Sequence, residues 1–122
     1  MENLDSREII YATFEYLYRD GGNFKSWGML LLEGEATEDK KKLLASCLDS
    51  GVWFSAEKFN IPVLYEGLMR FGPSTLDHGW HEFADLRPAT NTEIESNACF
   101  GDLDNLIHAF MHAKKTLGTY VP

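Results

Sequence analysis

The residues best suited to chemistry gather at one predicted turn between two apolar runs: Arg19, Asp20, Asn23 and Lys25. The two cations could hold an anionic group, or the set could pair with a charged partner. Alternatively, Asp20 and Asn23 satisfy backbone amides of the turn, while Arg19 and Lys25 form ion pairs with nearby acids. We expect these groups to serve the architecture of the turn and docking to a partner, rather than bond breaking.

Four histidines suggest a second kind of site, a metal centre. His108 and His112 have the i, i+4 spacing of metal ligands on a helix, and His78-x-x-His81 could complete a four-ligand set. However, Ala109 stands where the H-E-x-x-H motif of zinc proteases has its glutamate. Helical geometry also places His108 and His112 opposite the apolar stripe, so we expect both to face solvent. The sequence therefore predicts no metal ion and no cofactor.

His81 and Glu82 could form an acid–base couple, but neighbours on a strand point to opposite faces and cannot meet directly. The alternative function would be a small phosphoester hydrolase. It requires Arg19 and Lys25 to hold the anion, His81 as general acid–base, and Asp20 or Glu82 in support. The sequence contains no serine-nucleophile elbow, Walker loop or dinucleotide fingerprint.

Composition narrows the class of partner. The chain has 122 residues and a formal charge of −8, from 19 acidic and 11 basic residues. This charge argues against non-specific nucleic-acid binding, which needs a positive surface, and suits a protein partner with a basic face. Cys47 and Cys99 form no disulfide or metal pattern. The acidic N-terminus lacks signal-peptide features, and no apolar run approaches the ~18 residues that span a membrane, so we expect a cytoplasmic protein.

Alternating residues over 9–19 predict a strand with one face against the core. A turn over 20–23 and a second strand over 24–33, buried on both faces at its centre, would complete a hairpin. The free edges of a hairpin can pair with a second copy, so a homodimer is plausible. The core face of the first strand carries Ile10, Ala12, Phe14, Tyr16 and Tyr18.

The rest of the chain alternates between helical and extended patterns. Thr37 is a candidate N-cap for a helix over 38–50, which Gly51 would close. Further elements are expected in chain order: a short strand at 52–54, an ambiguous short helix within 63–76, a strand over 79–86, a loop over 89–101, and a helix from 101 or 102 to 117. The order predicts a single α+β domain over residues 1–122, with a mostly antiparallel sheet of four to five strands and two main helices packed against it.

Aromatic residues are plentiful among the predicted strands. Most should pack in the core, but a tryptophan exposed beside Tyr16 or Tyr18 would mark a partner surface. We therefore expect a non-enzymatic binding module, such as a regulator, inhibitor or immunity-type protein, that acts on a basic protein. Its candidate binding residues are Tyr16, Tyr18, Arg19, Asp20, Asn23, Lys25, Trp27 and Trp80.

The run from Tyr16 to Gly28, followed by residues 54–62 and 80–83, resembles a group of small uncharacterised bacterial proteins with a YRDxxNYKxxG hairpin. The resemblance covers residues 10–90 and leaves the C-terminal helix outside. Phe24 replaces the tyrosine of that motif, a change of little consequence if the ring only packs. The resemblance implies a small intracellular bacterial or phage-related domain, and it implies nothing about catalysis.

Overall fold

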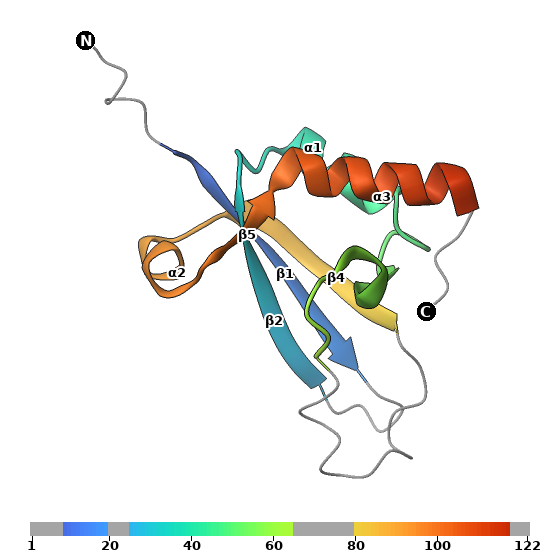
Figure 1. Ribbon diagram of the computed structural model, residues 1–122, viewed down its shortest axis with the longest axis horizontal. Coiled ribbons are helices and arrows are strands. Elements are labelled where there is room, and N and C mark those ends of the chain that lie inside the picture. The colour runs from blue at the N-terminus through green and yellow to red at the C-terminus, as the bar shows by residue number, and fades with distance from the viewer. Residues whose placement is uncertain (1–8, 20–24, 65–79, 118–122) are drawn as a thin grey trace.

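A computed structural model describes residues 9–19, 25–64 and 80–117 of the chain. The predicted turn at 20–23, His78 and most of the ambiguous segment 63–76 therefore lie outside the described residues. A five-stranded sheet in the order β3-β4-β1-β2-β5 forms the body of the fold (Figure 1). Its strands are β1 (Tyr11–Arg19), β2 (Lys25–Glu33), β3 (Trp53–Ser55), β4 (Trp80–Pro88) and β5 (Cys99–Asp102).

Three α-helices complete the described fold: α1 (Glu38–Ser46), α2 (Asn91–Ser96) and α3 (Leu103–Leu117). Only the β2–β5 pair is parallel, so the sheet is mostly antiparallel, and it curls as a half-barrel. Helices α1 and α3 lie together along one side of the sheet, while α2 stands apart from them (Figure 1). The predicted α+β class is confirmed.

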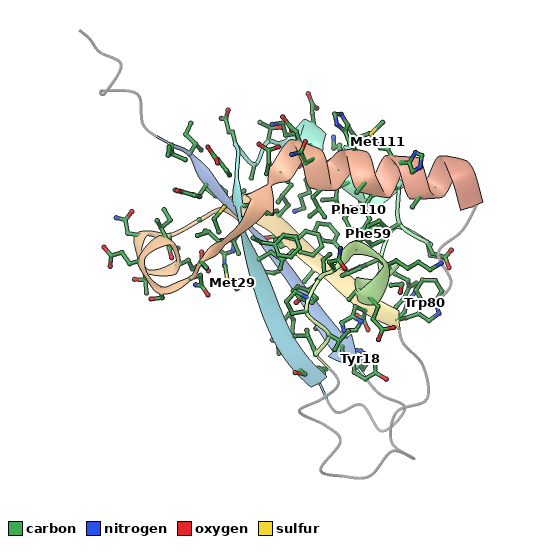
Figure 2. All side chains as sticks on the ribbon, in the orientation of Figure 1. Tyr18, Met29, Phe59, Trp80, Phe110 and Met111 are labelled. Carbon is green, nitrogen blue, oxygen red and sulfur yellow. The ribbon has the colours of Figure 1, made fainter. Side chains whose placement is uncertain are left out.

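The core forms where the alternating face of β1 meets α3. Ala12, Phe14, Tyr16 and Tyr18 are almost completely buried, as their period-2 spacing predicts. The prediction is wrong for Ile10, which precedes β1 and is 54% exposed, and Thr13 and Leu17 on the other face of the strand are buried as well. The Phe14 and Phe110 rings stack with their centroids 6.4 Å apart. Phe110 also packs against Phe59, at 4.3 Å between ring centroids (Figure 2). Each buried ring removes roughly 150–250 Å² from water, so this aromatic cluster stabilises the domain without disulfides.

The β1–β2 hairpin keeps one register along its whole length, from Tyr11 opposite Glu33 to Arg19 opposite Lys25. Leu30, Leu31 and Leu32 are buried, which confirms burial on both faces at the centre of β2. The expectation that the hairpin has free edges is wrong, because β4 pairs with β1 and β5 pairs with β2. The edges of the sheet are β3 and β5 instead.

Helix α1 begins as predicted and ends early. The Thr37 hydroxyl accepts a hydrogen bond from the Lys40 backbone N–H at 3.1 Å. The helix stops at Ser46 rather than residue 50, because the backbone of Asp49 pairs with Trp53 and draws the chain toward β3. Ser50 and Gly51 both have positive φ, at 55° and 76°, and make the tight turn that joins them.

The prediction of a loop over 89–101 is wrong, since this stretch contains α2 and β5. Thr90 and Glu93 form a reciprocal capping box that starts α2. Strand β5 then pairs in parallel with β2, and the Asp102 carboxylate accepts a hydrogen bond from the Asn105 backbone at the start of α3. The expected strand at 79–86 is present as β4 and runs two residues further, to Pro88.

Candidate functional site

The hairpin cation Arg19 pairs with Glu82 on the neighbouring strand. Its Nε and Nη2 atoms donate to the two carboxylate oxygens, at 3.0 and 3.4 Å. This hydrogen bond and the charge of Glu82 raise the pKa of Arg19 above its usual value. This ion pair is of the kind expected if the hairpin cations serve the architecture of the sheet. Lys25 lies opposite Arg19 on β2 and is exposed. Asp20 and Asn23 lie outside the described residues.

His81 is completely buried among aromatic rings. Its Nε2 atom accepts a hydrogen bond from the Leu64 backbone N–H at 3.1 Å, so the imidazole is neutral with its proton on Nδ1. The ring centroid lies 5.2 Å from that of Tyr18 and 6.0 Å from that of Phe54. His81 therefore belongs to the core face of β4, while Glu82 is on the opposite face with Arg19.

The positions of Arg19 and His81 decide whether the residues of the alternative phosphoester hydrolase can form one site. It needs Arg19, Lys25 and His81 to converge, but Arg19 and His81 belong to opposite faces of the sheet. The hollow beside Asp49, Trp53 and Trp80 and the one beside Leu43 and Met111 are not lined by these side chains. The geometry therefore gives the phosphoester alternative no support.

The four candidate aromatic residues divide into buried and accessible pairs. Tyr16 and Tyr18 are 1% and 0% exposed, so they are part of the core and not of a docking surface. The Tyr16 hydroxyl donates to the Pro62 carbonyl at 2.7 Å, and burial raises the pKa of Tyr16 to about 12. Trp27 is 62% exposed on β2, and Trp80 lines a hollow beside β3.

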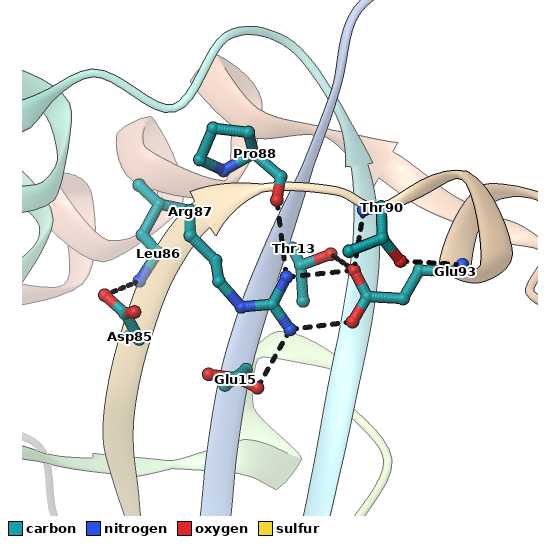
Figure 3. Close-up of polar contacts among 8 residues, drawn as sticks. All are labelled: Thr13, Glu15, Asp85, Leu86, Arg87, Pro88, Thr90 and Glu93. Atoms are coloured by element: carbon teal, nitrogen blue, oxygen red, sulfur yellow. Dashed lines mark hydrogen bonds and ion pairs between the residues drawn. The ribbon is translucent and has the colours of Figure 1, made fainter.

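The most connected polar group is structural. Arg87 donates two hydrogen bonds to Glu93, at 3.0 and 2.7 Å, and a third to Glu15 at 3.0 Å (Figure 3). The buried Thr13 hydroxyl donates to the same Glu93 carboxylate at 2.8 Å, as does the Thr90 backbone at 3.0 Å. The Arg87 hydrogen bonds are the main reason that the pKa of Glu93 falls to about 2. This network fastens α2 to β1 and β4.

Histidines and cysteines do not converge in the described part of the chain. His108 and His112 are exposed on α3, as their helical position predicts, whereas His81 is in the core. No group of three or more metal-ligating side chains occurs within residues 9–19, 25–64 and 80–114. Cys47 is buried and Cys99 is exposed, and both are reduced.

A charged surface that the motifs did not indicate lies where β2 and β5 run into the helices. We call it the acidic end; its exposed carboxylates are Glu33, Glu35, Glu38, Asp39, Asp102 and Asp104. Glu33 and Asp102 are partners in the β2–β5 register. A 3.1 Å ion pair between Lys40 and Asp104 joins α1 to α3 at the same place. The first turns of both helices therefore meet at one end of the sheet.

Exposed apolar side chains border the acidic end. Ile10 is 54% exposed, and its carbonyl accepts a 2.7 Å hydrogen bond from the backbone of Gly34, which follows Glu33. Phe100 is 38% exposed and precedes Asp102 by two residues. Exposed apolar side chains thus lie on residues that adjoin the exposed carboxylates, in the chain or across a backbone hydrogen bond. Sequence reasoning missed the acidic end because its members come from three distant stretches of the chain, residue 10, residues 33–39 and residues 100–104, although the net charge of −8 was a general signal.

No protein-family model, curated protein or solved structure matches the chain significantly. None of the helices in the described part of the chain has the length and apolar character needed to span a membrane.

Proposed function

We propose that this chain is a non-enzymatic binding module that docks through the acidic end against a basic surface of another protein. The observation that carries the proposal is the meeting of exposed carboxylates with Ile10 and Phe100 on one surface. Apolar side chains supply the burial that stabilises a complex, and surrounding charges set the partner and speed its approach.

The charges of the acidic end are only partly explained by local structure. Glu38, Asp39, Asp102 and Asp104 lie at the starts of α1 and α3, where the helix dipole favours negative charge. Glu33 and Glu35 lie outside both helices. Apart from Asp104 with Lys40, none of the six carboxylates forms an ion pair with another described residue. Glu33, Glu35, Glu38 and Asp39 are therefore available to a partner.

Charge reversal tests the proposal. A basic protein captured from a cell lysate at low salt on the immobilised chain is purified, and its affinity is measured by calorimetry. Glu35→Lys replaces an attraction with a repulsion and should weaken binding by about 1 kcal/mol, or roughly fivefold. The matched control is Glu95→Lys, an equal charge change at an exposed position of α2. Equal effects of the two variants, or failure to capture any basic protein, would count against the proposal.

A further inference from the structure

A hollow of about 360 Å³ lies beside β3 and β4, and the described residues that line it are Asp49, Ser50, Trp53 and Trp80. We call it the tryptophan pocket. Trp53 is opposite Glu82 and Glu82 is opposite Leu17 of β1, whereas the acidic end begins opposite Tyr11. Six residues along a strand correspond to roughly 20 Å, so the pocket is a separate surface and does not depend on the proposed function.

Backbone hydrogen bonds hold the lining residues in place. Asp49 and Trp53 exchange two of them, at 3.0 and 2.9 Å, and the turn between them is fixed by the positive φ of Ser50 and Gly51. Trp80 is positioned by its β4 pairing with Ser55, which is buried. A ligand would therefore meet a site that is already formed, so little affinity would be lost in ordering the site.

The lining is suited to an organic cation. The Asp49 carboxylate is exposed, and its side chain forms no hydrogen bond or ion pair with another described residue. Indole rings attract cations through their π faces, and tryptophan does so best among the aromatic residues. The Asp49 carboxylate can attract a cation by its charge, and the two indoles can attract it through their π faces. The Ser50 hydroxyl adds a hydrogen-bond acceptor.

Of the two cationic groups that protein side chains carry, guanidinium matches this lining better than the ammonium of lysine. It is planar and weakly hydrated, stacks on aromatic rings, and pairs with a carboxylate through two parallel N–H groups. An ammonium group is a strongly hydrated point charge that cannot stack. We propose that the tryptophan pocket binds the guanidinium group of an arginine side chain presented by another polypeptide.

Blocked amino acids test the proposal on the full chain. Nuclear magnetic resonance follows the indole N–H signals of Trp53 and Trp80 while N-acetyl-arginine methylamide is added. Trp27, exposed on β2, is the internal reference. We expect a saturable shift of the two pocket indoles in the millimolar range, about 1–10 mM, with Trp27 unaffected. The neutral isostere N-acetyl-citrulline methylamide should cause no saturable shift, and the lysine analogue should bind at least about threefold more weakly.

Two variants separate the role of the carboxylate from general charge. Asp49→Asn should weaken binding of the arginine probe by about tenfold, while Glu95→Gln, an equal charge change at an exposed position of α2, should leave it unchanged. Equal binding of arginine and citrulline, equal binding of arginine and lysine, or equal affinity for Asp49→Asn and the unmodified chain would overturn the proposal. So would the absence of a saturable shift up to about 50 mM probe, or tighter binding of free arginine than of its blocked form.

Discussion

Replacing Glu93 by glutamine removes the one charge that links α2 to two strands while keeping the shape of the side chain. Glu93 receives two hydrogen bonds from Arg87 and one from the buried Thr13. Glutamine can still accept from Thr13, but it loses the paired charge–charge contact with the guanidinium. No residue of α2 is buried. We therefore expect the ion pair between Glu93 and Arg87 to be the main attachment of α2 to the sheet.

The size of the effect follows from the pKa of Glu93. Lowering the pKa from 4.5 to about 2 corresponds to at most about 3 kcal/mol, at about 1.4 kcal/mol per unit of pKa. The side chain is 22% exposed, and solvent screening reduces the contribution, so we expect a loss of about 1–2 kcal/mol for Glu93→Gln at neutral pH. The folded-state pKa lies below the unfolded value. The stabilisation is therefore complete above about pH 4.5 and is lost as the pH falls toward about 2.

Urea unfolding at several pH values measures this effect. The unfolding midpoint of Glu93→Gln should fall by about 1 M urea at pH 7 relative to the unmodified chain. The difference should shrink between about pH 4.5 and pH 2, because acid neutralises the unmodified carboxylate as well. The control Glu95→Gln, exposed on the same helix, should change stability by less than about 0.5 kcal/mol. A Glu93→Gln deficit that matches this control at pH 7, or that persists unchanged in acid, would refute the reasoning.

Three further substitutions test the fold by the same unfolding assay. Gly34→Ala should cost about 1–3 kcal/mol, because φ is +138° and an added Cβ would lie 3.0 Å from the Leu103 Cβ. Gly101→Ala, with nothing within 4 Å, should be nearly neutral, and equal losses would contradict this explanation. Phe110→Ala should cost about 3–5 kcal/mol, whereas its 41% exposed neighbour Met111→Ala should cost less than about 1 kcal/mol. His81→Phe should cost about 2 kcal/mol, because the partly buried Leu64 backbone N–H loses its acceptor; unchanged stability would show that this hydrogen bond contributes nothing.

Sequence patterns predicted those elements that depend on residues within a single segment of the chain. The alternation of Phe14, Tyr16 and Tyr18 correctly identified the core face of β1, and Thr37 correctly marked the start of α1. The capping box of Thr90 and Glu93 was an equally local signal for α2, and it was present in the sequence. Strand β5 is different, because its four residues become a strand only by pairing with β2, more than sixty positions earlier.

The surfaces proposed for binding were harder to foresee for the same reason. Trp80 was selected from its residue type, but the pocket exists only because β3 brings Trp53 and Asp49 beside it. Tyr16 and Tyr18 are both candidate binding residues and members of the predicted core face, and the structure buries both. Spacing along one segment predicts which face a side chain takes. It does not predict which distant segments share that face.

The most direct test of the binding account is a map of the partner's footprint on the ¹⁵N-labelled chain, recorded with the purified basic partner at low salt. The account predicts that the largest amide shifts fall at Ile10, Glu35, Phe100 and Asp104, and that they fade as salt is added. A footprint centred on the exposed α3 face around His108 and His112, or one insensitive to salt, would contradict it.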